Sequence, residues 1–364
     1  MAEETKRRKA EHIKICLGQK IQSRKATTGF EDVHLVHKAL PEIDRAKIDL
    51  STTVFGHKFA APIIVGAMTG GTEEATKINA AIAEAVEKLN LGMGVGSQRA
   101  AIEDKDLVKT FAVARKKAPN AFLIANFGGV QLVHGYGMKE IKKAMEMIDA
   151  DALAIHMNAL QETVQPEGQT NFEGILVKIG EVADALDKPV IIKETGSGIA
   201  AEEARKLEAA GAKALDVGGC GGTSFAAVEY FRAETEETRS LSNALWDWGI
   251  PTAASLVEAT QTVKIPVIAS GGLRSGMDVA KALALNACLA SVSQPVLEVA
   301  VINAKETQRF LSCLIEELRN VMFLVGARKS GDLEKVPTVI TNKTAEWLKA
   351  RGFGIEGFAR RGAV

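Results

Sequence analysis

A group of closely spaced polar residues follows one apolar run of the chain. The stretch 155–168, IHMNALQETVQPEG, begins like the end of a buried strand and then collects His156, Asn158, Gln161 and Glu162. Polar side chains cost free energy when they are buried unless they are paired. Such residues suit a site that binds a polar ligand, where imidazole and carboxylate groups can also transfer protons. The alternative is a polar network that only fills space.

Other apolar runs also end in residues that could bind an anion. Lys193 follows Ile191 and Ile192, and a lysine in such surroundings needs an anionic partner, either a structural carboxylate or a bound ligand. The glycine-rich stretch 218–224, GGCGGTS, follows another run. Its glycines let backbone N–H groups approach a ligand closely, although a flexible turn would also explain them.

The run that ends at Ser270 leads through SGGLRSG directly into a helical pattern. A helix start offers unpaired N–H groups and the positive end of the helix dipole, so we expect a phosphate group there. Arg99, in GVGSQRA, could clamp an anion with two hydrogen bonds or form a surface salt bridge. Asn126, in NFGG, could be a ligand donor or a turn former.

Regular elements must position these residues. Eight short apolar runs alternate with helix-length segments, which matches the α/β class and a (β/α)8 barrel, with an open doubly wound sheet as the alternative. In a barrel the active site lies at the carboxyl ends of the strands. Because side chains alternate along a strand, we expect His156 and Asn158 to share the inward face with Ala152 and Ala154. The runs begin at Ala61, Leu91, Ala121, Asp151, Lys188, Lys213, Ile265 and Ala287.

Length and composition bound the domain organisation and the partners. In the chain of 364 residues we expect an N-terminal extension over 1–60, the barrel over 61–329 with an insertion at 224–250, and a C-terminal helical tail over 330–364. The 45 basic and 45 acidic residues balance, so we expect a small-molecule ligand rather than nucleic acid or a membrane. The four cysteines form no CxxC pair. No apolar run or signal peptide pattern indicates membrane insertion or export, so we expect a cytoplasmic protein.

Taken in order, the motifs resemble those of the type 2 isopentenyl diphosphate isomerases. The resemblance runs from RRKAEHI near the N-terminus to LVGARK near residue 329, and includes MTGG, GVGSQR, QLVHGYG, QETVQPEG, KETGSG, GGTS, DWGIPTAAS and SGGLRSG. It implies a barrel enzyme that moves the double bond of isopentenyl diphosphate to give dimethylallyl diphosphate. It also implies reduced FMN and Mg²⁺ as cofactors, with NAD(P)H reducing the flavin and the chemistry residing in the cofactor.

The resemblance also assigns roles to individual residues. Catalytic or substrate-side positions match His156, Asn158, Gln161 and Glu229, and Glu162 matches the carboxylate that holds Mg²⁺, an ion that needs few protein ligands. The residues that match substrate-binding positions, together with Gln161, are Arg8, Lys9, Ser97, Gln98 and Arg99. The match of Arg8 and Lys9 implies that the N-terminal segment folds over a site, its own or that of a neighbouring subunit.

For the flavin, the resemblance implies contacts from several strand ends. Lys193 should stabilise the anionic reduced flavin by Coulomb attraction. The residues that match FMN contacts are Ala67, Met68, Thr69, Ser97, Asn126, Lys193, Thr223, Gly272 and Arg274.

The eighth unit departs from the family pattern. Asn286 and Cys288 stand where Gly and Asp are usual, and Ser291 and Ser293 stand where Gly and Ala are usual. We expect the unit still to supply backbone N–H groups to the FMN phosphate at Ser293 and Gln294, although extra bulk at Ser291 could crowd that approach.

Two other functions are compatible with parts of the sequence. One is an FMN-dependent barrel oxidoreductase acting on a small hydroxy acid, but QETVQPEG and GVGSQR have no place in it. The other is a non-catalytic barrel that binds a phosphate ligand, which would not need Arg99, Gln161, Glu162 and Lys193 together. The resemblance further implies a homo-oligomer, either a tetramer or an octamer.

Overall fold

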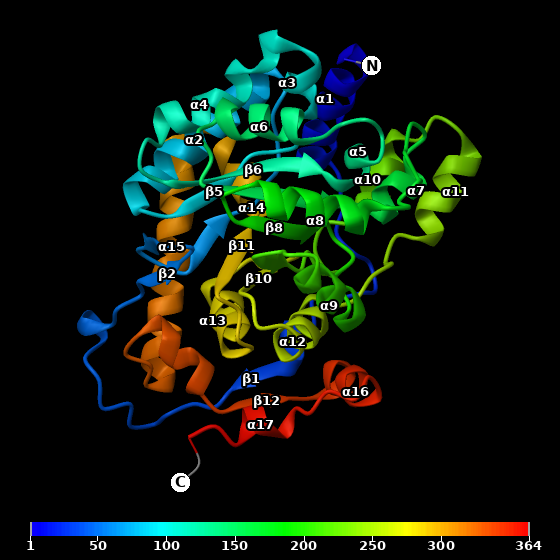
Figure 1. Ribbon diagram of the computed structural model, residues 1–364. Helices are drawn as coiled ribbons and strands as arrows, with labels where there is room; N and C mark the ends of the chain where they lie inside the picture. The colour runs from blue at the N-terminus through cyan, green and yellow to red at the C-terminus, as the bar shows by residue number, and fades with distance from the viewer. Residues whose placement is uncertain (1, 363–364) are drawn as a thin grey trace.

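The computed structural model describes residues 2–362, with side chains from Arg7 onward. Eight parallel strands close into a barrel in the order β10-β11-β4-β5-β6-β7-β8-β9, and helices surround it (Figure 1). The barrel strands are β4 (Ile63–Val65), β5 (Gly92–Gly94), β6 (Phe122–Gly128), β7 (Ala152–Met157), β8 (Val190–Glu194), β9 (Ala214–Asp216), β10 (Val267–Ser270) and β11 (Leu289–Val292). Each predicted apolar run supplies one strand, so the (β/α)8 barrel is confirmed.

The connections between strands carry the outer helices. The predicted insertion at 224–250 folds as α10 and α11, between β9 and α12. In order along the chain, these helices are α2 (Glu73–Leu89), α3 (Arg99–Glu103), the 3₁₀ helix η3 (Lys105–Leu107), α4 (Lys109–Lys117), α5 (Gly129–Leu132), α6 (Met138–Met147), α7 (Ala159–Val164), α8 (Ile175–Ala185), α9 (Ala201–Ala209), α10 (Phe225–Arg232), α11 (Glu236–Ala244), α12 (Thr252–Thr262), α13 (Gly276–Ala284), α14 (Gln294–Ala300) and α15 (Ala304–Val325).

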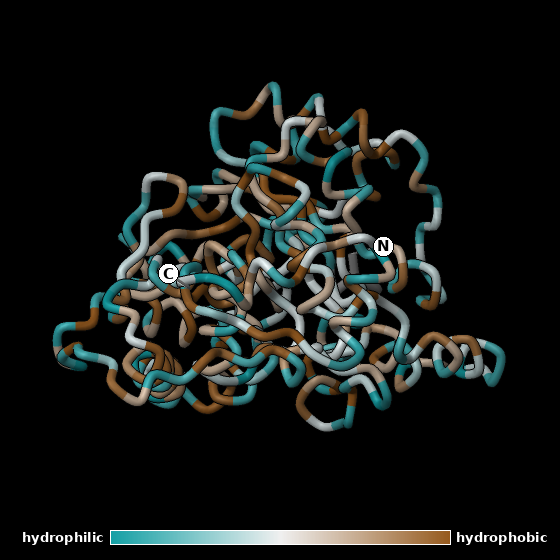
Figure 2. Tube along the Cα trace, turned by 90° about the horizontal axis from the view of Figure 1, so that it is seen from below, coloured by the Kyte–Doolittle hydropathy of each residue, from teal (hydrophilic) through white to brown (hydrophobic). Residues whose placement is uncertain are grey.

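Alternation along the strands separates two hydrophobic layers. On β7, Ala152 and Ala154 belong to the cluster inside the barrel, whereas Leu153 and Ile155 pack in the larger cluster between the barrel and the helices. The predicted faces of this strand are therefore confirmed. Brown and teal segments alternate along the peripheral helices in Figure 2, as expected for helices with one buried face.

A hairpin from the N-terminal extension closes the bottom of the barrel. Its strands, β2 (Thr52–Val54) and β3 (His57–Phe59), pair antiparallel. The fully buried Phe59 packs edge to face against Phe122 of β6, with ring centroids 5.6 Å apart. Because the hairpin fills this end with aromatic side chains, a ligand can enter only through the opposite mouth.

The two ends of the chain pair with each other beside the barrel. Strand β1 (Val33–Leu35) pairs antiparallel with β12 (Thr338–Ile340), so the segment 330–364, for which we predicted a helical tail, contains a strand as well as helices. The pairing joins residues about 300 positions apart, and a local sequence pattern cannot reveal it. The remaining elements of these ends are α1 (Ala2–Gly18), η1 (Phe30–Asp32), η2 (Arg45–Lys47), η4 (Ser330–Lys335), α16 (Asn342–Ala350) and α17 (Glu356–Ala359).

The atypical eighth unit adopts the expected strand and helix. Asn286 lies at a positive φ of 71°, a conformation that asparagine tolerates better than most residues. Its side-chain oxygen accepts a hydrogen bond of 2.7 Å from Arg361 near the C-terminus. Cys288 packs against the cluster inside the barrel. Within residues 2–362, no helix has the length and apolarity required to cross a membrane.

The plug at the bottom of the barrel gives a stability prediction. The substitution Phe59→Ala should lower the free energy of unfolding by about 3–5 kcal/mol, because it leaves a cavity among fully buried side chains. Urea denaturation would measure the change, with Leu40→Ala as a control in the same extension, since Leu40 is 75% exposed. Equal effects of the two substitutions would contradict this role for the hairpin.

Candidate active site

A cavity of about 280 Å³ opens at the carboxyl ends of the strands. It brings together most of the residues predicted from the sequence. Those that line it are Arg8, Lys9, Ala67, Met68, Thr69, Ser97, Arg99, Asn126, His156, Asn158, Gln161, Glu162, Lys193, Thr223, Gly272, Arg274, Ser293 and Gln294.

Each barrel strand contributes one residue to an inward-facing layer beneath the cavity, which we call the floor, and five of these eight residues line the cavity itself. These residues lie two positions beyond an inward-facing residue of the same strand, and strand alternation therefore directs them inward as well. Strands β4 and β5 contribute glycines, and the other six strands contribute polar side chains. In barrel order from β4, the floor residues are Gly66, Gly94, Asn126, His156, Lys193, Asp216, Ser270 and Ser291.

His156 is held as a neutral imidazole on this floor. Its Nδ1 lies 2.8 Å from Asn126 Oδ1, and the Asn126 amide nitrogen donates to Val95 O at 3.1 Å. That second bond fixes the amide, so Nδ1 carries the hydrogen and Nε2 is an acceptor. Burial, together with the charges of Lys193 and Lys9, lowers the pKa of His156 to about 4.

Lys193 has both of the environments that we considered. Its Nζ lies 3.0 Å from Asp216 Oδ2, so it has a structural carboxylate partner. The same side chain also lines the cavity. Ser270 links the pair to the glycine-rich loop, because its hydroxyl donates to Asp216 and accepts the N–H of Gly218 at 3.0 Å. This arrangement fixes a cation at the floor.

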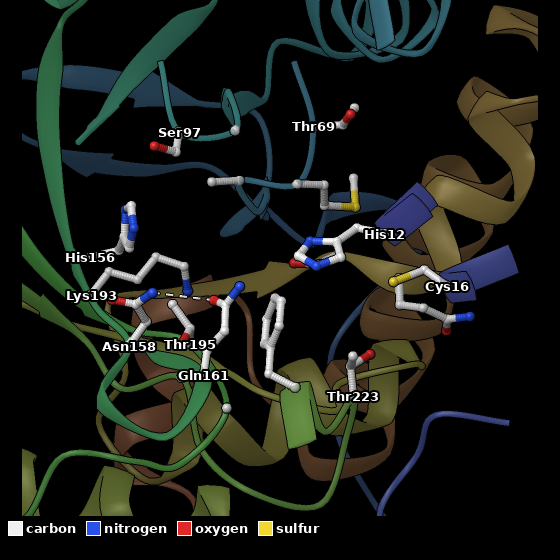
Figure 3. Close-up of a pocket in the computed structure, with 18 of the residues that line it drawn as sticks. His12, Cys16, Thr69, Ser97, His156, Asn158, Gln161, Lys193, Thr195 and Thr223 are labelled. Carbon is white, nitrogen blue, oxygen red and sulfur yellow. Dashed lines mark hydrogen bonds between the residues drawn. The ribbon is translucent and has the colours of Figure 1, made fainter. Parts of the chain in front are cut away.

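One wall of the cavity carries the polar residues that follow β7. The Asn158 amide nitrogen donates to Glu162 Oε1 at 2.9 Å and to Gln161 Oε1 at 3.3 Å. Figure 3 shows Asn158 and Gln161 beside Lys193 and His156. Glu162 Oε2 accepts the N–H of Gln169 at 2.7 Å. Asn158 Oδ1 is buried and has no hydrogen-bond partner within residues 2–362.

Helix α1 forms the roof and lies over the cavity of its own chain. Arg8, Lys9, His12 and Cys16 line the cavity from one helix face, because residues three or four apart lie on the same side of a helix. In Figure 3, His12 and Cys16 lie across the cavity from His156. Lys9 Nζ donates to Ser97 O at 2.6 Å, and burial beside Arg8 lowers the pKa of Lys9 to about 7.

Arg232 on α10 anchors this roof. Its guanidinium contacts the carboxylates of Glu11 on α1 at 3.0 Å, Glu167 after α7 at 2.9 Å, and Glu229 on its own helix. Glu229 is fully buried and also contacts His12 Nε2 at 2.9 Å. Glu229 does not line the cavity, but it contacts His12, which does.

Gln98 is the other predicted site residue that does not reach the cavity. It is fully buried, and its amide donates to Ala144 O at 2.8 Å and accepts the N–H of Asn126 at 3.0 Å. Its motif neighbour Arg99 does line the cavity and is paired with Glu103 at 2.7 Å. We expected Gln98 to contact the substrate. Its side chain is instead hydrogen-bonded within the protein and fixes the end of β6.

Several N–H groups at the start of α13 already have acceptors. The N–H groups of Arg274 and Ser275 donate to Asp278 at 3.0 Å, and that of Gly276 donates to Glu317 at 2.6 Å. Carboxylates therefore accept three of the N–H groups that we expected to be free, and the local sequence pattern could not reveal the distant Glu317.

Free backbone donors lie instead in the glycine-rich loops beside this helix. Within residues 2–362, the N–H groups of Thr223 and Gly272 have no acceptor, and both residues line the cavity. A Cβ on Gly222 would collide with the backbone of Gly272, so glycine is required where the two loops meet. These donors make the loops a suitable phosphate site.

Several lining residues escaped the sequence analysis. His12 lies four residues after Arg8, and the helical spacing of Arg8, His12 and Cys16 was the signal that could have revealed the roof. Ser270 lies at a strand end and lines the cavity, and so does Ser291, which the sequence analysis considered only for its bulk. Strand alternation applied to β10 and β11 would have identified both.

The fold and the site define a class of protein, a closed (β/α)8 barrel whose mouth lies between a roof that carries basic residues and a polar floor. A family model described as FMN-dependent dehydrogenase matches residues 1–124 and 131–339. Two relatives named isopentenyl-diphosphate delta-isomerase are similar over most of their length. The protein from Methanosarcina barkeri is 46% identical, covering 100% of this chain and 99% of its own, and that from Pyrococcus furiosus is 49% identical, covering 94% and 89%. The chain therefore belongs to the isopentenyl-diphosphate delta-isomerases.

Solved structures share the fold at low sequence identity. A mandelate oxidase variant superposes with a TM-score of 0.63 at 19% identity, covering 93% of this chain and 98% of the other. An (S)-mandelate dehydrogenase gives a TM-score of 0.64 at 14% identity, covering 91% and 96%. These similarities show a shared fold, and they give no information about the reaction.

The anchoring of the roof can be tested at Arg232. The substitution Arg232→Met should lower the free energy of unfolding by about 3 kcal/mol, because it leaves buried Glu229 with only His12 as a partner. Trypsin should then cleave α1 faster than in the unmodified protein. The control is Arg309→Met, which removes an exposed pair with Glu306 and should change stability by less than about 1 kcal/mol. Unchanged cleavage of α1 in Arg232→Met would show that other contacts hold the roof.

Proposed function

We propose that this protein converts isopentenyl diphosphate into dimethylallyl diphosphate by a 1,3-proton shift in isoprenoid biosynthesis, with reduced FMN and Mg²⁺ as cofactors and NAD(P)H as the reductant of the flavin. The observation that carries the proposal is the 46% identity to an isopentenyl-diphosphate delta-isomerase across the whole chain. We further propose that it acts in the cytoplasm as a homo-oligomer, a tetramer or an octamer.

The cavity fits a flavin nucleotide because it holds unpaired polar groups. Asn158 Oδ1 and Ser291 Oγ are buried without a partner in the described part of the chain, and the backbone donors of Thr223 and Gly272 lie along the same cavity. Buried polar groups are nearly always paired in native proteins. The residues that would hold FMN are Ala67, Met68, Thr69, Ser97, Asn126, Lys193, Thr223, Gly272, Arg274, Ser293 and Gln294. When bound, reduced FMN supplies the proton-transfer chemistry.

The polar residues that follow β7 on the cavity wall suit a Mg²⁺ ion that is bound together with a substrate. Glu162 presents a buried carboxylate, and the unpaired Asn158 Oδ1 lies on the same wall. No cluster of three or more metal-ligating side chains occurs within residues 2–362. That suits Mg²⁺, which is often bound by one or two carboxylates, water and substrate phosphates. Glu162 would therefore hold the ion, and the positive charge of the ion would attract the substrate diphosphate.

The remaining residues bind and enclose the substrate. Arg8 and Lys9 provide positive charge in the roof for the diphosphate. Gln161, on the opposite wall, orients the substrate between roof and floor. His156 stays neutral near pH 7 because its pKa is about 4, so it contributes a hydrogen bond rather than a competing charge. Helix α1 covers the mouth and excludes water from the reacting carbons.

An anaerobic turnover assay tests the proposal. Labelled isopentenyl diphosphate, Mg²⁺ and NADPH are incubated with the protein while FMN is titrated from zero. Dimethylallyl diphosphate should form in proportion to bound FMN, with NADPH consumed only in catalytic amounts. Absence of product at saturating reduced FMN, in a folded protein, would overturn the isomerase assignment. Stoichiometric consumption of reduced flavin would instead indicate an oxidoreductase.

The low pKa of Lys9 predicts proton uptake when an anion binds. The pKa of Lys9 is about 7, so its side chain is mostly neutral at pH 8. A nearby diphosphate favours the charged form and raises the pKa. Calorimetric titration with inorganic pyrophosphate, in buffers of different ionisation enthalpy, should show greater proton uptake at pH 8 than at pH 6, where Lys9 is already charged.

Two variants separate this effect from the titration of pyrophosphate itself. Lys9→Met should abolish the extra proton uptake at pH 8. Lys14→Met, which removes an exposed lysine from the same helix, should leave it unchanged. Identical uptake in all three proteins would contradict the assignment of Lys9 to the anion site.

A further inference from the structure

Ser291 is the one floor residue whose side-chain polar atom has no partner within residues 2–362. It lies two positions after Leu289, which belongs to the cluster inside the barrel, so its side chain points inward. Ser291 is only 2% exposed, and its hydroxyl oxygen makes no hydrogen bond. By contrast, Asn126 pairs with His156, and Lys193 pairs with Asp216 and Ser270.

Packing does not explain this hydroxyl. A Cβ on the neighbouring floor residue Gly66 would lie 2.7 Å from Ser291 Oγ and would also meet the hydroxyl of Ser293. Both hydroxyls therefore lie in space that is available because residue 66 has no side chain. A buried donor left without an acceptor costs about 1–3 kcal/mol. An alanine would fill nearly the same volume without that cost.

A hydrogen-bond partner for the Ser291 hydroxyl can approach from the cavity. Ser291 and Ser293 both line it, and strand pairing places Ser291 directly opposite Ser270, itself a lining residue. The loops that follow these two strands supply Gly272, Arg274 and Gln294 to the same part of the cavity. Arg274 and Gln294 contact each other at 3.1 Å, so the two loops face a common space next to Ser291.

We propose that the Ser291 hydroxyl forms a hydrogen bond with the bound FMN. The inference rests on the proposed FMN binding and goes beyond it, because the resemblance places glycine at this position and offers no side-chain contact there. Ser291 is thus a flavin-binding residue particular to this chain. Flavin binding would supply the partner that the Ser291 hydroxyl lacks among residues 2–362.

The test is the affinity of the full-length, flavin-free protein for FMN, measured by quenching of flavin fluorescence. Ser291→Ala should raise the dissociation constant about tenfold, which corresponds to about 1.4 kcal/mol. The matched control is Ser242→Ala, because Ser242 is also a fully buried serine with an unpaired hydroxyl but does not line the cavity. The control should bind FMN within twofold of the unmodified protein.

Thermal unfolding distinguishes a ligand contact from a structural role. Without flavin, Ser291→Ala should unfold at the same or a higher temperature, because it removes a buried unpaired hydroxyl. Added FMN should raise that temperature less than it does in the unmodified protein. A structural role would instead lower the unfolding temperature of the flavin-free variant.

Three outcomes settle the inference. Weaker FMN binding by both Ser291→Ala and Ser291→Gly, with the control unchanged, supports it. An unchanged dissociation constant in Ser291→Ala overturns it and assigns water as the partner of the hydroxyl. If the unmodified protein itself fails to bind FMN, the proposed function fails and the inference fails with it, a result visible before any variant is measured.

Discussion

The site depends on one geometric constraint, the alternation of side chains along parallel strands that close into a barrel. Each strand must direct every second residue inward, and all eight carboxyl ends meet at one mouth. Chain segments as distant as Gly66 and Ser291 therefore contribute to a single floor. Below this floor the inward residues are apolar and the hairpin β2–β3 plugs the barrel. The polar layer thus begins where the apolar filling ends.

The roof adds a second, electrostatic constraint. Helix α1 brings two basic residues, Arg8 and Lys9, into a partly buried space, which is unfavourable without compensating charge. The carboxylate of Glu167 lies 3.6 Å from the Arg8 guanidinium and partly offsets its charge. The Arg232 guanidinium contacts the same carboxylate at 2.9 Å. Because Arg232 keeps Glu167 paired, Arg8 can turn toward an anion in the cavity without leaving a buried carboxylate alone. The network therefore combines a stable roof with cations available for a ligand.

The barrel could be predicted from local patterns in the sequence, whereas most of the residues that line the cavity were named from the family resemblance. The short apolar runs marked every strand, and alternation placed His156 correctly. The misplaced residues depend on contacts that span long stretches of sequence. Glu229 is turned away from the cavity by His12 and Arg232, and Gln98 is occupied by Ala144 and the end of β6. The strand β12 and the carboxylate of Glu317 at α13 likewise depend on distant partners.

We propose that this cavity catalyses an internal proton shift with no net oxidation of the flavin. The most direct test follows the visible absorbance of bound, reduced FMN under anaerobic conditions while many equivalents of isopentenyl diphosphate are added. We expect the flavin to stay reduced throughout turnover while dimethylallyl diphosphate accumulates. Reoxidation of one flavin for each substrate molecule consumed would contradict it and would make the protein an oxidoreductase built on the same barrel.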